Sequence, residues 1–176
     1  MQFYLQNGLL VAVALTGIIM LPGGIINAVT SALAGRMYDS FGAKWPARIG
    51  FIIAFIGALM LSIVTTHSAI WYVILAHIIL MIGAPLAMSP SQTSALNSLK
   101  GLESADGSAI LNTMQQIVGA LATALATSFL TIGRNAVSGS AAFKFTNGVH
   151  YGMYFTIVLT IIGFIVALFV TDDGKE

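Results

Sequence analysis

Five apolar runs occupy most of this sequence, and most of them reach the roughly 20 residues that a helix needs to cross a lipid bilayer. They cover about residues 8–34, 49–64, 69–88, 107–132 and 149–170, and none of them contains Asp, Glu, Lys or Arg. Hydrophobic residues make up 57% of the chain and charged residues 7%, against about 25% charged residues in an average soluble domain. So few polar groups cannot cover a surface that faces water. The sequence therefore predicts an all-α integral membrane protein, a single membrane domain with about five transmembrane helices.

The sequence also excludes several classes of function. There is no cysteine, so disulfides, thiolate catalysis and Cys-ligated zinc are ruled out. A net charge of +1 and the absence of a Lys/Arg cluster predict no nucleic-acid partner. No P-loop, HExxH motif or Ser/His/Asp arrangement is present. We therefore expect a protein that is not an enzyme and that holds no metal and no cofactor.

The distribution of Lys and Arg predicts the orientation. Under the positive-inside rule, the side with more basic residues faces the cytoplasm, which places the 35–48 loop and the C-terminus there. The N-terminus then lies outside, which is unusual for a complete protein without a signal peptide. We therefore expect a fragment that lacks its N-terminal spans. The two sets compared are Arg36, Lys44, Arg48, Lys100 and Lys175 against Arg134 and Lys144.

The most specific stretch connects the first two spans and reads Gly-Arg-Met-Tyr-Asp-Ser-Phe-Gly-Ala-Lys at 35–44. Its two glycines allow a tight turn and a close approach of neighbouring helices. Its aspartate can accept hydrogen bonds from the N-terminal amides of an adjacent helix, or pair with a basic neighbour. The stretch is either a latch between helices or an ordinary charged turn. The candidate latch residues are Gly35, Arg36, Asp39, Gly42 and Lys44.

This loop resembles the signature loop of the major facilitator superfamily, although Ser40 and Ala43 stand where a basic residue is usual. The resemblance implies an all-helical C-terminal portion of a major facilitator fold, aligned with the last five spans. It also implies that the loop latches neighbouring helices in one state of alternating access. Other short pieces recur together in the group of fourteen-span drug:proton antiporters: Leu21-Pro22-Gly23, the stretches 89–93 and 95–97, and the stretch 105–109 that leads into 112–116.

The fourth span is unusually polar. Asn112, Gln115 and Gln116 recur at helical spacing on one face. Amides inside a bilayer must find partners or water. They therefore form either hydrogen bonds to neighbouring helices, an interfacial cluster, or a polar wall of a translocation cavity. Small residues on the same span predict a close helix contact: Gly119, Ala120, Thr123, Ala124 and Thr127.

Two further cavity candidates lie in or near the third span. Pro85 and Pro90 are expected to bend or break its far end. Gln92 follows these prolines. It is either a hydrogen-bond partner for the carbonyls that they free or an ordinary polar residue at a helix end. His77 lies in the middle of the predicted span. It is either a titrating or ligand-binding group or a hydrogen-bond donor whose partner lies within the protein. The other two histidines are expected to be solvated near the outer surface: His67 and His150.

No carboxylate lies within any predicted span, and a proton-coupled carrier normally needs one there. In the resembling family those carboxylates lie in the N-terminal half. The predicted function is the C-terminal part of a proton-coupled multidrug efflux carrier of the cell membrane, inactive alone. Its expected partners are the lipid bilayer, the missing N-terminal half, amphipathic small-molecule substrates and protons taken up through that half. The alternatives are a complete small membrane protein that acts as an assembly or regulatory partner, and a small homodimeric carrier.

Overall fold

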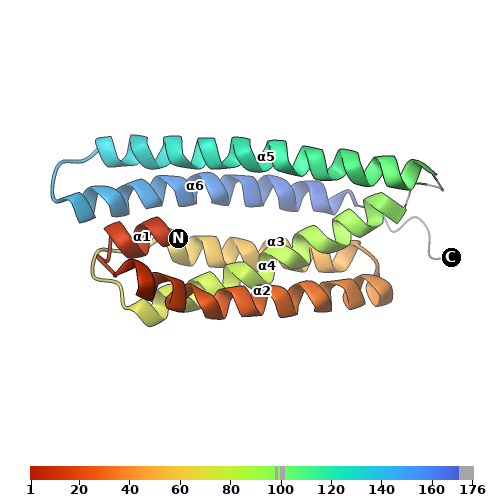
Figure 1. Cartoon of the computed structure of the whole chain (residues 1–176), viewed down its shortest axis with the longest axis horizontal. Helices are drawn as coiled ribbons and strands as arrows, with labels where there is room; N and C mark the ends of the chain where they lie inside the picture. Colours follow the sequence, from red (N-terminus) through yellow and green to blue (C-terminus); the bar gives the residue numbers. More distant parts are fainter. Residues whose placement is uncertain (98, 100–101, 171–176) are drawn as a thin grey trace.

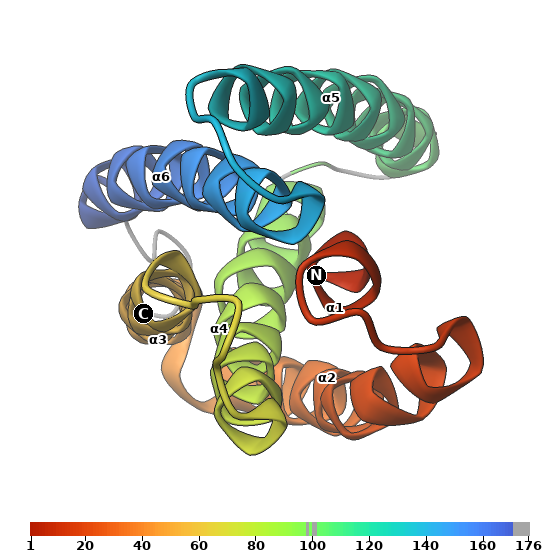
Figure 2. The same ribbon diagram turned by 90° about the vertical axis from the view of Figure 1, so that its left-hand side faces the viewer.

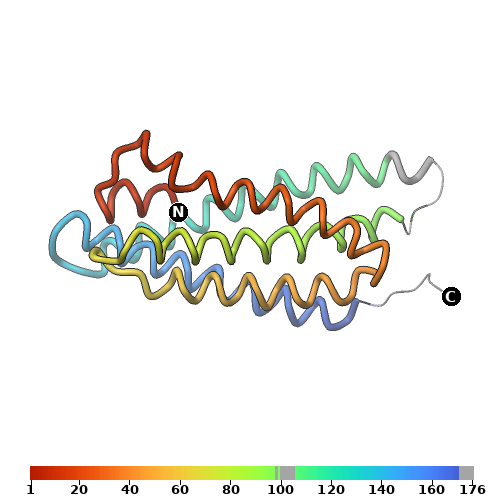
Figure 3. The backbone as a smooth tube through the Cα atoms, turned by 90° about the horizontal axis from the view of Figure 1, so that it is seen from below, coloured from red at the N-terminus to blue at the C-terminus, as the bar shows by residue number. Residues whose placement is uncertain are grey.

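The computed structural model describes residues 1–97, 99 and 102–170, and this part of the chain forms one short helix and five long ones. Each long helix runs roughly antiparallel to the one before it in the chain, so alternate helices share a direction (Figure 1 and Figure 3). All five are long and apolar enough to cross a membrane, which confirms the predicted fold class. The helices are α1 (Gln2–Asn7), α2 (Val13–Phe41), α3 (Lys44–Ser62), α4 (Ile70–Asn97), α5 (Leu102–Asn135) and α6 (Ala141–Leu168).

The helices differ from the predicted spans at their ends. The first long helix begins later, at Val13, and the regions predicted as loops, 35–48 and 133–148, are helical except at 42–43 and 136–140. Hydropathy marks only the part of a helix that suits the hydrocarbon core. Once a helix has formed, each further residue adds a hydrogen bond, so helices continue into polar sequence. The basic residues Lys100 and Lys175, used to predict orientation, lie outside the described residues.

Three glycines set the closest helix contact, that of α3 with α4. A Cβ atom added to any of these glycines would overlap backbone atoms of the facing helix, and no side-chain rotation could relieve the overlap. Small residues let helix backbones approach closely in a membrane, where packing rather than hydrophobic burial holds helices together. The α3–α4 pair is therefore the most tightly fixed part of the bundle. The facing pairs are Gly50 with Ala87, Ala54 with Gly83, and Gly57 with Leu80.

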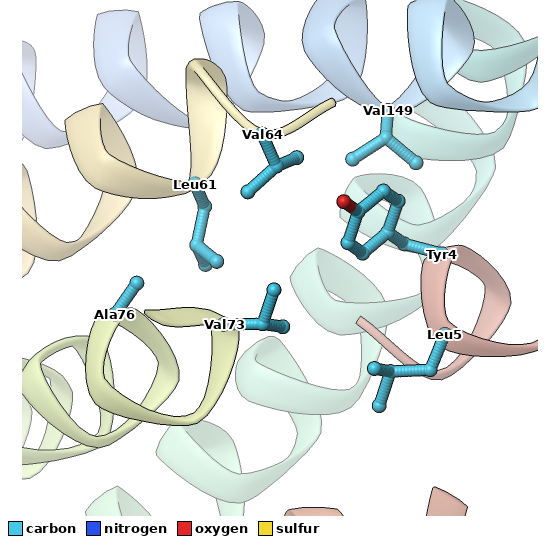
Figure 4. Packing of buried hydrophobic residues seen from close by; sticks show 7 residues of the cluster. All are labelled: Tyr4, Leu5, Leu61, Val64, Val73, Ala76 and Val149. Carbon is cyan, nitrogen blue, oxygen red and sulfur yellow. The ribbon is translucent and has the colours of Figure 1, made fainter. Parts of the chain in front are cut away.

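One end of the bundle is closed by α1, whose Tyr4 and Leu5 are fully buried (Figure 4). Burial raises the pKa of the Tyr4 phenol, so its hydroxyl stays protonated and donates a hydrogen bond to the Thr65 carbonyl. At the same end, the imidazole of His150 bonds to the Val64 carbonyl. His150 is therefore half-buried and partnered rather than simply solvated, as its place near the outer surface had suggested. The cluster around Tyr4 also contains Leu61, Val64, Val73, Ala76 and Val149.

Arg48 ties the opposite end of the bundle together. Its guanidinium donates hydrogen bonds from Nε to the Ala167 carbonyl (3.3 Å) and from Nη2 to the Leu168 carbonyl (2.7 Å). These carbonyls lie in the last turn of α6, where no later amide of the helix can reach them. A cation is also favourable at the negative end of the helix dipole. Arg48 therefore caps α6 from the neighbouring helix.

Arg48→Met should destabilise the bundle by about 1 kcal/mol, since the apolar stem stays and only the donors are lost. Thermal unfolding in detergent, followed by circular dichroism, would measure this. Arg36→Met is the matched control, because Arg36 is an exposed cation at the same end of the bundle. Equal effects of the two substitutions would show that net charge, and not the cap, is responsible.

Candidate functional site

The predicted latch sequence forms the last turns of α2 and a turn of only Gly42 and Ala43 before α3. Gly42 has φ +72°, a conformation that side chains other than glycine rarely adopt, and its amide bonds to the Tyr38 carbonyl at 2.9 Å. Gly42 is therefore required by the sharp reversal. Gly35 faces open space within the described residues, so its predicted close approach to a neighbour is not made here.

The charged latch residues lie at the surface of this turn. Arg36 and Asp39 are exposed on α2, and Lys44 is half-buried at the start of α3. A polar contact also joins this end of α2 to α4, because the Asn97 amide donates to the Tyr38 hydroxyl at 3.1 Å. The structure thus links α2, the turn and α4 at one end of the bundle. Pairing of Asp39 with a basic residue stays a prediction.

The polar residues of the fourth span all lie on α5. Asn112 and Gln116 are exposed and Gln115 is half-buried. None of the three amides hydrogen-bonds to another residue within the described part of the chain. Their helical spacing is as predicted, but they do not join helices of this bundle. The reason is the position of α5, which packs against α6 and slightly against α4, while no other described helix packs on it (Figure 2).

The close helix contact predicted on α5 is made by other residues. Gly119 faces open space, and the other small residues grouped with it are also exposed or line a cavity. The contact is instead made further along, where Gly133 of α5 crosses Gly148 of α6. There the Asn147 amide donates to the Gly133 carbonyl at 2.7 Å. A pair of glycines allows the two backbones to approach, and the predicted stripe is left free for another partner.

The two candidates on α4 are far apart. His77 is buried against Gly23 of α2, where a side chain on Gly23 would lie 2.5 Å from the imidazole Cδ2. Its Nδ1 is buried and has no hydrogen-bond partner among the described residues. Gln92 is half-buried about 22 Å further along the helix, at 1.5 Å per residue. The structure therefore does not bring His77, Gln92 and the α5 amides into one cluster.

A residue that the sequence analysis missed explains how α4 continues through its prolines. Pro85 has no amide hydrogen, so the carbonyl of Met81 loses its helical partner. The Asn27 side chain of α2 donates to this carbonyl at 3.3 Å. The prolines therefore do not break α4, which runs to Asn97. An asparagine in an otherwise apolar span was the available signal.

The structure also contains a cavity of about 570 Å³ between α1, α5 and α6. None of the five predicted cavity residues lines it. Three threonines at four-residue spacing on α5 and Arg134 at its end line this cavity, but their sequence pattern does not show which helices pack opposite them. That the five candidates line a different cavity, which further helices complete, stays a prediction.

Comparison with known proteins gives a consistent family. No family model matches the chain and no solved structure is similar to it. The lincomycin resistance protein LmrB of Listeria monocytogenes is 33% identical over 97% of this chain and 38% of the relative. LmrB of Bacillus subtilis is 36% identical over 96% of this chain and 37% of the relative. The uncharacterized MFS-type transporter YcnB of Bacillus subtilis is 27% identical over 95% of this chain and 36% of the relative.

Five long apolar helices, each antiparallel to the one before it, define a multi-pass membrane protein. The relatives then specify the kind of membrane protein. The chain belongs to the major facilitator superfamily, as its motifs predicted, and it spans between 36% and 38% of the length of these relatives.

Proposed function

We propose that this chain is the C-terminal part of a proton-coupled efflux carrier for amphipathic drugs, which works by alternating access. Its C-terminus lies in the cytoplasm, and the chain is inactive without the remaining spans. The latch at 35–44 links α2 to its neighbours in one state of the cycle. The relatives that are drug resistance proteins support the substrate class.

The observation that carries this proposal is the uncovered polar face of α5. An amide in contact with lipid hydrocarbon leaves its donors and acceptors without hydrogen-bond partners, which costs several kcal/mol by transfer estimates. Within membrane proteins the cost is about 1 kcal/mol, because the amide can find other polar partners. Asn112 and Gln116 have no such partners within the described residues. Of the alternatives that the sequence leaves open, we propose that they face a water-filled path or other helices when the protein is complete, and not the bilayer surface. A carrier whose cavity lies between two halves supplies both.

Proton coupling is assigned to the other spans. No Asp or Glu lies within the predicted spans of this chain, and neutral amides do not bind protons near neutral pH. The amides on α5 then contact the substrate and do not drive transport. A carboxylate in the remaining spans binds the coupling proton.

Lincomycin efflux from cells that lack their own drug exporters would test this proposal. This chain would replace the matching segment of Bacillus subtilis LmrB, and the chimera would be compared with this chain alone. We expect efflux from the chimera, abolished by a proton uncoupler, and none from the chain alone. Gln116→Leu in the chimera should lower efflux about tenfold, the effect of one lost hydrogen bond of about 1.4 kcal/mol. Asp39→Asn should also lower efflux from the chimera, because it removes the negative charge of the latch.

Val118→Ala is the matched control, because Val118 is also exposed on α5 but lies 200° around the helix from Gln116, at 100° per residue. Efflux from the chain alone would contradict the proposal and favour the homodimeric carrier. A chimera that reaches the membrane in normal amounts and does not export lincomycin would also contradict it. Equal losses from Gln116→Leu and Val118→Ala would remove the role assigned to the polar face.

A further inference from the structure

The cavity between α1, α5 and α6 has a size within the range of small-molecule pockets. Its volume is about 570 Å³, and Met1, Phe3 and Tyr4 contribute to its lining. It therefore lies beside α1, which is at one end of the bundle (Figure 1). The walls are mainly aliphatic and aromatic, with phenyl rings contributed by Phe145 and Phe155 of α6. The cavity is distinct from the polar residues Asn112 and Gln116, which do not line it.

The hydroxyl groups in the cavity are already used. Thr123, Thr127 and Thr131 of α5 donate to carbonyls one turn earlier in their own helix at 2.8–2.9 Å, and Thr156 of α6 does the same at 3.0 Å. A hydroxyl has one hydrogen to donate. The threonines therefore present methyl groups and weak acceptors to the cavity. A ligand rich in acceptors gains little there, and a hydrocarbon chain fits the walls.

Arg134 is the exception, and it lies at one end of the cavity in the last turn of α5. Its guanidinium lies over the Phe145 ring, 4.5 Å from the ring centroid. No carboxylate pairs with it in the part of the chain that the structure describes. The hydrogen-bond donors of the guanidinium are therefore available to an anion. A helix end also lies at the depth of lipid headgroups, where arginine side chains reach phosphates.

We propose that this cavity binds an anionic phospholipid, with one acyl chain against the threonine face of α5 and the headgroup phosphate on Arg134. The apolar walls select the hydrocarbon, and the single cation selects the charge of the headgroup. The same cation disfavours a cationic drug at this position. The proposal concerns a lipid site and does not depend on transport activity.

Photo-crosslinking would locate the lipid directly. The chain would be reconstituted into phosphatidylcholine vesicles that contain phosphatidylglycerol with a diazirine in its acyl chain, and the adducts would be mapped by mass spectrometry. We expect adducts concentrated at 122–134 and 145–159. Photoreactive phosphatidylcholine should give roughly fivefold fewer adducts there, because its choline cation offsets the phosphate charge and removes about 1 kcal/mol of net attraction to Arg134.

Arg134→Gln should lower the phosphatidylglycerol adducts to the phosphatidylcholine level, and Arg134→Lys should keep part of the preference. Lys144→Gln is the matched control, since it removes the same charge from the same end of the bundle at a residue outside the cavity lining. Ala126→Phe, which fills the cavity, should lower adducts from both lipids. Adducts spread evenly over all helices, equal adducts from both lipids, cross-links to a second chain, or displacement of the lipid by lincomycin would each overturn the proposal.

Discussion

Gly83→Ala is expected to destabilise the bundle by about 3 kcal/mol, an effect at the upper end of what overpacking usually causes. The added Cβ would lie 2.6 Å from the Ala54 Cα and 2.7 Å from the Gly50 carbonyl oxygen. Both are backbone atoms of α3, so no side-chain rotation relieves the overlap. The two helices must separate, and the packing that holds them together in a membrane is then lost. The higher helix propensity of alanine, about 1 kcal/mol, offsets only part of this loss.

Unfolding of the purified chain in mixed micelles with increasing dodecyl sulfate, followed by far-ultraviolet circular dichroism, would measure the loss. Gly24→Ala is the matched control, because Gly24 is also inside a long helix and its Cβ would meet nothing within 4 Å. This control should be neutral or slightly stabilising. If Gly83→Ala unfolds no earlier than Gly24→Ala, the α3–α4 contact is not as close as the structure shows.

The number and kind of helices were predictable from the sequence, because lipid imposes a minimum apolar length on every span. The contacts between helices were less accessible. Gly50, Ala54 and Gly57 form a small-residue face on α3. A similar stripe on α5 makes no such contact, since Gly119 faces open space and its threonines line the cavity. Small residues show where a helix can be approached. They do not show which helix approaches.

The candidate site was predictable only in part. The turn at Gly42 follows from local chemistry, because only glycine suits a backbone of φ +72°. The helical spacing of Asn112 and Gln116 follows from the pitch of a helix. The cavity next to Arg134 depends on how α1, α5 and α6 meet, and no local pattern contains that information. For the same reason, the burial of His77 against Gly23 was not foreseen.

Pro85 and Asn27 form a pair whose coupling was equally hidden, since the two residues lie on different helices. Asn27→Leu should destabilise the bundle by about 1–2 kcal/mol, because it leaves the Met81 carbonyl without a donor in an apolar environment. Pro85→Ala restores an amide hydrogen at the position that normally bonds to Met81. In the Pro85→Ala background, Asn27→Leu should therefore cost almost nothing.

A double-mutant cycle in the same micelle unfolding assay would measure this coupling. The expected interaction energy between positions 27 and 85 is about 1–2 kcal/mol. Pro90→Ala supplies the control cycle, because Pro90 lies in the same helix but frees the Leu86 carbonyl, which Asn27 does not reach. Asn27→Leu should keep its full cost in that background. If Asn27→Leu costs the same in the Pro85→Ala background as in the parent chain, the amide of Asn27 does not replace the missing hydrogen bond. The continuity of α4 through its prolines then has another cause.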